Sequence, residues 1–378
     1  MIAKLIETNT KAEVNGGYHD WAKTVEQCRG QGAIAKRALI LRAYENYIWG
    51  LDDIRNVRAL IVELTMNPEP KDRYDVHLLL EVHTRNSSYA MSEKERTAIL
   101  QRSIPREFWS LTTLWSEEEL TWLYPNLPGQ FLNHMIPTNS YRSCFMPVQV
   151  FSKNHPQYDF IWNWEMDTRS TQEYSETLER IGSYAKRAPI DQLLEHQSRW
   201  NIPASSTNAN RFDINGEEAD LITLNPFFNT NNSGYYWAYD FQKFPKDTLQ
   251  RSSIGKNVRF SKRLLKAMSD ANAEERMSAH CENYAATMLV HKARSEMQEK
   301  WKGVYVPHPI YTRRVWPEDK LSKAVNRDDV YRKVNERVLR EFSFYYDGAH
   351  AKDIYVAWRN NSNACRAPSL LHPIKRQP

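Results

Sequence analysis

Two carboxylates stand at the end of an apolar run in the stretch YDFIWNWEMDTRS, residues 158–170. Residues two apart point to the same side of an extended strand, so Glu165 and Asp167 are expected to share one side. Two acids at a strand end form a hard oxygen site that suits Mg²⁺ or Mn²⁺. They could also supply a general base, or a counter-charge for a cationic substrate. The structural alternative is a surface turn in which one of them pairs with Arg169.

Further chemical groups gather in three other segments. In YENYIWGLDD, Glu45, Asp52 and Asp53 could face a guanidinium group, although helix capping is the simpler role for the two aspartates. The aromatic loop FFNTNNSGYYWAYDF could stack a base or a side chain, or cover the sheet edge. The basic stretch QRSSIGKNVRFSKRLLK is the best candidate for an RNA-backbone surface, although a solvated helix face explains any single charge in it. Its cations are Arg251, Lys256, Arg259, Lys262, Arg263 and Lys266.

Strands and helices alternate along the chain, which predicts an α/β fold with a mostly parallel central sheet flanked by helices. RALILRAY has the length of a buried strand, LDDIRNVRALIVELTM has apolar residues at helical spacing, and YDVHLLLEVH is again a strand. The sheet is expected to contain strands 37–44, 74–83 and 158–164. Helices are expected at 141–153, 259–269, 278–299 and 328–342.

The length of 378 residues permits two or three domains, or one elaborated α/β domain. We predict an N-terminal extension over residues 1–35 and an α/β domain over 36–317. A helical C-terminal extension over 318–378 is expected to pack on that domain.

The composition is that of a globular chain, with 41% hydrophobic and 26% charged residues. The formal net charge of +5 is compatible with an anionic partner without indicating one. No signal peptide or apolar run of membrane length is readable, and the four cysteines form no CxxC pair. We therefore expect a cytoplasmic protein with free thiols and no membrane contact.

Several blocks resemble a fungal family described only as a domain of unknown function. They include RALILRAYENY, YDVHLLLEVH, YDFIWNWEMDTR, EEADLITLNPFF and VYVPHPIYTRRVWP, between about residues 37 and 317. The resemblance implies a glycosyltransferase-A-like (Rossmann-like) sheet, with EMD standing where those enzymes carry an Asp-x-Asp metal motif. One soluble branch resembles the arginine-containing cyclodipeptide synthases, which join arginine to a second amino acid using aminoacyl-tRNA. Thr168 departs from the aliphatic residue that usually follows the motif.

The resemblance also nominates two residues outside the motif. Glu282, in SAHCENYAAT, matches an acid of the family, and an acid from this region can act as general base in that fold. Charge pairing at a helix N-terminus is the alternative role of Glu282. His308 ends the predicted strand GVYVPH, and a late histidine often completes the metal shell in that fold.

The first functional hypothesis is an aminoacyl-tRNA-dependent cyclodipeptide synthase that forms a cyclo-arginine-Xaa product. Its partners would be arginyl-tRNA and a second aminoacyl-tRNA, held by the basic stretch, and no stable protein partner is expected. No cofactor is required, because the aminoacyl ester already carries the energy of the reaction. The catalytic residues would be Glu165, Asp167 and Glu282, and the substrate-binding residues Tyr44, Glu45, Asn163, Arg169 and Trp237.

The alternative hypothesis is a metal-dependent glycosyltransferase that uses a nucleotide sugar. Glu165, Asp167 and His308 would then surround Mg²⁺ or Mn²⁺. A third possibility is a pathway scaffold whose site is inactive. Longer family members often carry a membrane anchor, so its absence here, with the basic stretch, favours the tRNA-dependent reaction.

Overall fold

A seven-stranded sheet forms the centre of the computed structural model, which describes residues 19–29, 35–66, 73–129, 135–188, 199–200, 216–295, 299–348, 350–360 and 366–375. The strands of this sheet are β1 (Arg37–Tyr44), β2 (Tyr74–Glu81), β3 (Thr112–Trp115), β4 (Phe160–Glu165), β6 (Leu221–Thr223), β10 (Val258–Ser261) and β12 (Gly303–Tyr305). Their order across the sheet is β12-β6-β10-β4-β1-β2-β3, and β10 runs antiparallel to both of its neighbours. The predicted α/β fold with a mostly parallel central sheet is confirmed.

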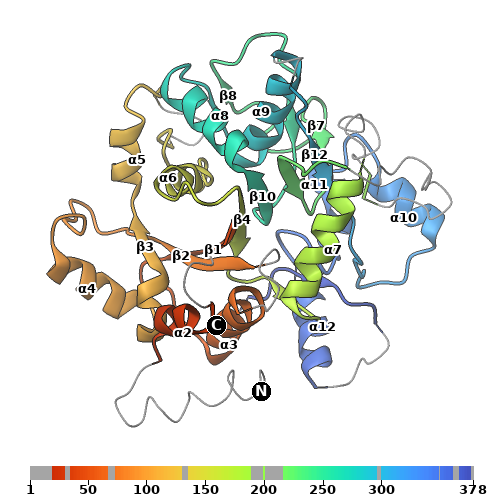
Figure 1. Cartoon of the computed structure of the whole chain (residues 1–378). Helices are drawn as coiled ribbons and strands as arrows, with labels where there is room; N and C mark the ends of the chain where they lie inside the picture. Colours follow the sequence, from red (N-terminus) through yellow and green to blue (C-terminus); the bar gives the residue numbers. More distant parts are fainter. Residues whose placement is uncertain are drawn as a thin grey trace.

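Helices cover both faces of the sheet, with α2 and α3 on one side and α6 and α8 on the other (Figure 1). The helices are α2 (Trp21–Arg29), α3 (Leu51–Leu60), α4 (Glu93–Ser103), α5 (Glu117–Leu123), α6 (Met146–Asn154), α7 (Tyr174–Arg187), α8 (Lys262–Ala273), α9 (Cys281–Ser295), α10 (Glu318–Val325), α11 (Lys333–Leu339) and α12 (His350–Arg359). A π-helical turn, η3 (Ile61–Thr65), extends α3, and a 3-10 turn, η5 (Arg106–Leu111), precedes β3. Because side chains alternate along a strand, Leu39 and Leu41 of β1 pack in the layer of α3, while Ala38 and Ile40 pack in the layer of α6.

Short strand pairs complete the fold outside the central sheet. They are β5 (Arg169–Ser170) with β13 (Leu370–Leu371), β7 (Phe228–Asn229) with β9 (Arg251–Ser252), and β8 (Phe241–Gln242) with β11 (Ser278–Ala279). The first pair matters for the site, because it attaches the C-terminal segment directly after β4. A hydrogen bond of 2.8 Å from the N–H of Ile374 to the carbonyl of Asp167 extends this attachment.

The strand order reverses between β1 and β4. From β1 the chain moves outward to β2 and β3, and it then returns to the other side of β1 as β4. Both β1 and β4 point their carboxyl ends to the same edge, because they are parallel. Such a reversal opens a crevice beyond the strand ends, where open α/β sheets bind ligands.

Two predicted helices differ from the structure. Residues 258–261 form the reversed strand β10, and Ser261 both ends this strand and caps α8 by accepting a hydrogen bond from the N–H of Leu264. The strand therefore continues into the helix without a turn residue. For this reason, the spacing of the apolar residues did not reveal the boundary between β10 and α8. The predicted helix 328–342 is helical only over α11, because Val330 and Tyr331 before it are buried in a separate apolar cluster.

Cys144 and Cys281 form a disulfide bond, with their Cα atoms 5.5 Å apart. The prediction of free thiols is therefore wrong for this pair. The two cysteines are far apart in the sequence, and neither spacing nor composition indicated that the fold brings them together. Among the described residues, no helix is both long enough and apolar enough to cross a membrane.

Candidate cation and substrate site

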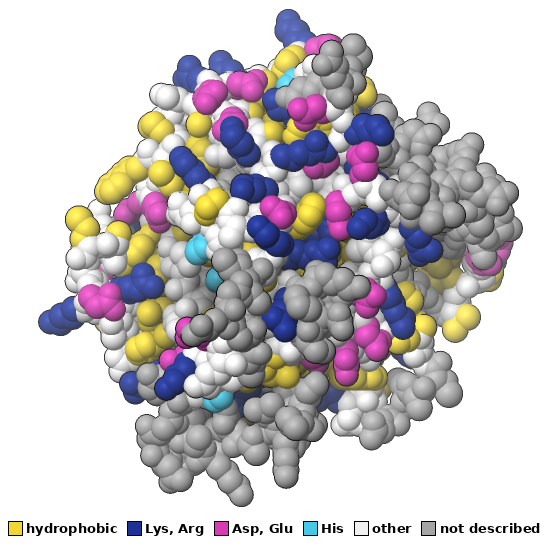
Figure 2. Space-filling view, in the orientation of Figure 1, with side chains coloured by type: hydrophobic (Ala, Val, Ile, Leu, Met, Phe, Trp, Pro, Cys, Tyr) yellow, Lys and Arg dark blue, Asp and Glu magenta, His cyan; other side chains and the backbone are white. Residues whose placement is uncertain are grey.

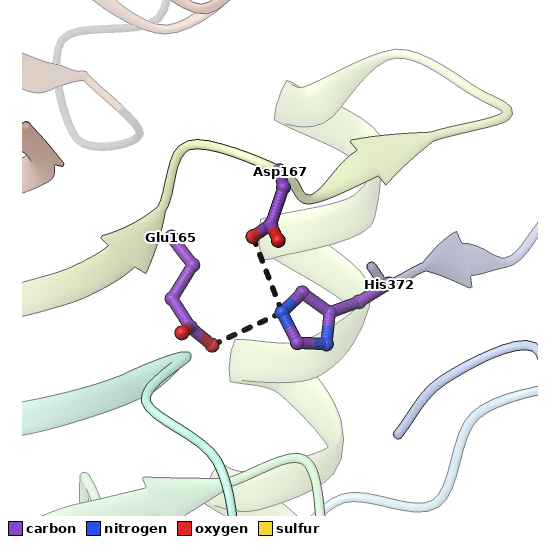
Figure 3. A group of neighbouring side chains, drawn as sticks. All are labelled: Glu165, Asp167 and His372. Atoms are coloured by element: carbon purple, nitrogen blue, oxygen red, sulfur yellow. Dashed lines mark ion pairs between the residues drawn. The ribbon is translucent and has the colours of Figure 1, made fainter. Parts of the chain in front are cut away.

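Glu165, Asp167 and His372 face one another at the carboxyl edge of the sheet (Figure 3). The Nε2 atom of His372 lies 3.3 Å from Oε2 of Glu165 and 3.2 Å from Oδ1 of Asp167. One possible ligand atom from each of the three residues lies within 4.8 Å of the others. Of the described parts of the chain, this is the one place where three such side chains meet closely enough to hold a metal ion.

A turn brings the two acids together. Strand β4 ends at Glu165, and the N–H of Thr168 then donates to the carbonyl of Glu165 at 3.2 Å. The side chain of Met166 is buried in the core on the other side. Glu165 and Asp167 therefore share one side as expected, although a turn after the strand, and not a continued strand, places Asp167.

His372 reaches the acids from the C-terminal segment, and its ring is held in one orientation. Its Nδ1 lies 2.5 Å from the carbonyl oxygen of Tyr345, so this nitrogen donates a proton and Nε2 is left facing the carboxylates. The backbone N–H of His372 donates to the carbonyl of Ser343 at 3.0 Å. A histidine that ligates a metal commonly donates its other N–H to a carbonyl in this way.

The three groups perturb one another's protonation. Although burial opposes a charge on the ring, Glu165 and Asp167 together raise the pKa of His372 to about 10. Burial likewise favours neutral carboxyl groups, but the adjacent charge of His372 lowers the pKa of both Glu165 and Asp167. All three groups are thus charged near neutral pH, and a cation would take the place of the proton on Nε2.

The cluster opens into a cavity of about 560 Å³ at the switch point between β1 and β4. The lining residues come from the ends of both strands, the turn that follows β4, the loop before α3, the first turn of α3, the loop before β10 and the C-terminal segment. They are Arg42, Tyr44, Asn46, Tyr47, Ile48, Asp53, Asn163, Glu165, Met166, Asp167, Lys256, Ile374 and Lys375. The amide oxygen Oδ1 of Asn163 is buried there without a hydrogen-bond partner among the described residues, so a ligand could satisfy it.

The donor set of the cluster fits a divalent cation. Carboxylate oxygens suit Mg²⁺ and Mn²⁺, whereas an imidazole nitrogen is a better ligand for transition metals than for Mg²⁺. A mixed set of two carboxylates and one imidazole therefore favours Mn²⁺ among the cations that accompany phosphates. Glu165, Asp167 and His372 are the residues that would hold it.

Glu282 lies near this cluster, in the first turn of α9. The N–H of Gly255 donates to its Oε1 at 2.6 Å, and the hydroxyl of Tyr235 donates to its Oε2. Burial raises the pKa of Glu282, although the hydrogen bonds from Tyr235 and Gly255 and the charge of Lys256 oppose the rise. A carboxyl group whose affinity for a proton is raised in this way is suited to act as a general base.

His308 does not join the carboxylates in the structure. Its ring packs edge-on against Phe344, at 4.5 Å between ring centroids, and Phe344 in turn separates it from His372. His308 lines a different cavity of about 660 Å³, between α7 and the C-terminal segment. Burial lowers the pKa of His308 to about 4. The late histidine beside the acids is His372, and this corrects the predicted metal set.

The predicted substrate-binding residues divide into two groups. Tyr44 and Asn163 line the cavity. Trp237 is buried, stacked at 4.6 Å on the ring of His280, and is not part of the cavity wall. Arg169 is 2% exposed and directs its guanidinium group into the protein. Neither Trp237 nor Arg169 is thus available to bind a substrate directly.

Glu45 is also occupied within the protein. Its carboxylate accepts hydrogen bonds from the N–H groups of His83 and Thr84, at 2.7 and 2.8 Å, and pairs with Arg102. Although burial opposes the shift, these bonds lower the pKa of Glu45 to about 2. Glu45 therefore closes the loop after β1, and the prediction that it faces a substrate guanidinium is wrong.

The basic stretch does not form one surface. Arg259 is 1% exposed, pairs with Glu218 at 2.9 Å and lies over the ring of Phe160 at 4.5 Å. Ser261 is paired with Phe160, the first residue of β4, so α8 begins at the amino edge of the sheet, opposite the cavity. Lys262 consequently starts at the edge away from the cluster, while Lys256 lines the cavity.

Two of the remaining cations are neutralised locally, and the third, Arg251, donates from Nη1 to the carbonyl of Gln250 at 2.9 Å. Arg263 pairs with Asp220 and Lys266 with Asp270, each at 2.6 Å. On the face drawn in Figure 2, the Lys and Arg side chains of the described residues alternate with Asp and Glu and form no continuous basic area. The prediction that the six cations share a face leading to the acidic pocket is therefore wrong.

The residues of the site that were not predicted from the sequence include Tyr235 as the partner of Glu282, His372 in the cluster with the two acids, and Lys375 in the wall of the cavity. The segment LLHPIK that carries two of them has no spacing motif, because its function depends on a contact with β4 that is distant in sequence. The aromatic loop was noted for possible stacking, whereas the structure shows that Tyr235 of this loop donates its hydroxyl group to Glu282.

The chain belongs to the family described as Protein of unknown function (DUF3405), whose model matches residues 7–215 and 206–376. These matches include the strands of the sheet, the turn after β4 and His372. A comparison with curated proteins finds no significant match.

Proposed function

We propose that the cavity is the active site of a transferase that uses a divalent cation to bind a diphosphate-linked substrate, such as a nucleotide sugar. The convergence of Glu165, Asp167 and His372 within 4.8 Å at the switch point of the sheet carries this proposal. Ligands of open α/β sheets bind at this place. Carboxylate ligands suit the cations that accompany phosphates.

The cations in the cavity wall support an anionic substrate. Arg42, Lys256 and Lys375 line the same cavity as the two acids. The charge of Lys256 lowers the pKa of Glu165, and that of Lys375 lowers the pKa of Asp167, so both ammonium groups lie near the cluster. A diphosphate would be attracted by these groups.

The side chains then divide the chemistry of transfer. A bound cation would neutralise the diphosphate as it leaves. Lys256 and Lys375 would stabilise the negative charge that develops on the same leaving group. Glu282, kept in place by Tyr235 and Gly255, would accept the proton of the attacking hydroxyl group.

A glycosyltransferase-A-like fold agrees with this function. The mostly parallel sheet and the EMD triplet, which begins at the last residue of β4, support this part of the proposal. His372 takes the place that the sequence assigned to His308. The expected set of two carboxylates and one imidazole is therefore kept, but the imidazole comes from the C-terminal segment.

The second candidate is the aminoacyl-tRNA-dependent cyclodipeptide synthase, and the environment of Glu282 favours it. A buried carboxyl group with a raised pKa would also accept a proton from the ammonium group of an aminoacyl ester. Two observations weaken this candidate. Glu45 pairs with Arg102 and is not available to bind arginine, and the cations of the basic stretch do not form one surface for tRNA. We therefore rank it second.

A parallel assay of both reactions tests the proposal. One arm supplies nucleotide sugars with Mn²⁺ and measures release of nucleoside diphosphate, and the other supplies arginine, its synthetase and total tRNA. We expect turnover in the first arm that is abolished by chelation and by His372→Gln and is unaffected by RNase. The matched control is His291→Gln, because that histidine lies on α9 outside the cavity wall. A cyclic dipeptide that disappears on RNase treatment and survives chelation would establish the second candidate instead.

A further inference from the structure

Arg169 is enclosed by the protein and directs its hydrogen bonds at the turn that carries Asp167. Its Nη1 donates to the carbonyl of Met166 at 2.6 Å and to the carbonyl of Thr168 at 3.1 Å. These are the carbonyls of the two residues that flank Asp167. The guanidinium group therefore holds the backbone of the turn from within the protein.

Two aspartates at the start of α3 hold the guanidinium in turn. Nε of Arg169 lies 2.9 Å from Oδ2 of Asp52, and Nη2 lies 2.7 Å from Oδ1 of Asp53. Asp53 also accepts from the N–H of Gly50 at 3.0 Å, so its carboxylate is fixed to the helix N-terminus. The arrangement ties the turn after β4 to the first turn of α3.

We propose that Arg169 is a positioning residue that sets the geometry, and thereby the cation affinity, of the Glu165–Asp167–His372 cluster. The inference rests on the proposed function, because it assumes that this cluster binds a cation. Arg169 touches neither the cation ligands' side-chain oxygens nor the cavity. It acts through the backbone on both sides of Asp167.

The C-terminal helix α12 is attached to the same network. The other carboxylate oxygen of Asp52, Oδ1, accepts from the hydroxyl of Tyr355 at 2.9 Å and from Nη1 of Arg359 at 2.6 Å. The docking of α12 therefore orients Asp52, which orients Arg169, which holds Asp167. A change in α12 is expected to reach the cation site along this chain of contacts.

Arginine is needed here because four acceptors surround one planar group. The fixed fork of a guanidinium can serve two carbonyls and two carboxylates at once, whereas an ammonium group offers three donors from one point. Arg169→Lys should keep the positive charge beside Asp52 and Asp53 and lose the hold on the turn. This substitution separates geometry from charge.

Equilibrium binding of Mn²⁺, followed by the electron paramagnetic resonance of the free ion, tests the inference. We expect Arg169→Lys to weaken binding about 10-fold, as changes behind metal ligands commonly do. Tyr355→Phe should weaken binding less than Arg169→Lys, because it removes one of two bonds from α12 to Asp52. Amide exchange at Ile374 should accelerate in Arg169→Lys, because that N–H is bonded to Asp167.

The matched control is Arg58→Lys. Arg58 is a buried arginine on α3 that pairs with Glu107 at 2.6 Å, away from the cavity. The Arg58→Lys variant should be less stable than the wild type but should bind Mn²⁺ with the same affinity. If the wild type binds Mn²⁺ and Arg169→Lys binds it equally well, the inference is wrong and the cation site stands. If the wild type binds no cation, the proposed function and the inference fall together.

Discussion

Removing the disulfide bond between Cys144 and Cys281 is expected to destabilise the protein and to disturb the site at the same time. The simplest change is the double substitution Cys144→Ala with Cys281→Ala. Both residues are buried, so alanine avoids placing a polar group in the core. The bond joins positions separated by 137 residues, so its loss restores much freedom to the unfolded chain.

The loop size sets the expected magnitude. Closing a loop of that length removes an entropy from the unfolded chain that corresponds to about 5 kcal/mol at 25 °C. Measured losses for native disulfides are commonly about 2–5 kcal/mol, because the unfolded chain retains some structure. We therefore expect the free energy of unfolding to fall by about 2–5 kcal/mol.

The bond also lies beside two residues of the site. Glu282 directly follows Cys281, and Arg42 donates to the carbonyl of Cys144. The double variant should therefore lose turnover before it unfolds, as Glu282 becomes less well fixed. A loss of stability without any loss of turnover would show that the bond stabilises the fold but does not support the site.

Urea unfolding followed by tryptophan fluorescence measures the effect, with the oxidised wild type as reference. Cys28→Ala controls for the loss of a thiol as such. Proteolysis without reductant should release one linked pair of peptides that contains Cys144 and Cys281. If no linked pair is found, and the variant unfolds at the same urea concentration as the wild type, the proposed bond is refuted.

Three further substitutions test particular features. Burial raises the pKa of Glu63 to about 7. Between about pH 4.5 and 7 the folded state therefore keeps a proton that the unfolded state releases, so the free energy of unfolding should fall as the pH rises through this range. Glu63→Gln should remove this pH dependence in thermal melts recorded across the same range. Gly255→Ala should lower turnover strongly, because Gly255 has φ of +99° and its N–H holds Glu282; an active variant would exclude Glu282 as the base. Asp167→Asn should abolish turnover and cost about 1–3 kcal/mol, because it leaves a buried imidazolium with one carboxylate fewer; full activity in a steady-state assay would remove Asp167 from the mechanism.

The strands around the site could be predicted from the sequence because each is a continuous apolar run. The strands predicted at residues 37–44, 74–83 and 158–164 match β1, β2 and β4 to within a few residues. Glu165 and Asp167 could be predicted for the same reason, since they follow such a run at once.

The remaining features depend on contacts that no local pattern records. The predicted RNA surface rested on cations that are close together along the chain. In the structure, however, the change from β10 to α8 places Arg259 in the core and Lys262 at the edge of the sheet opposite the cavity. His372 could not be distinguished from His308, because only the pairing of β13 with β5 decides which one reaches the acids. Glu45 was misassigned because its partner Arg102 lies on α4.

The origin of His372 has a consequence for the synthesis of the protein. All seven strands of the central sheet leave the ribosome before residues 366–375, so the nascent chain can fold its sheet while the cation cluster still lacks its imidazole. Until that segment pairs with β5, the turn after β4 carries two acids without their third ligand. Under the proposed function, cation binding and activity are therefore expected only as a late step in the maturation of the protein.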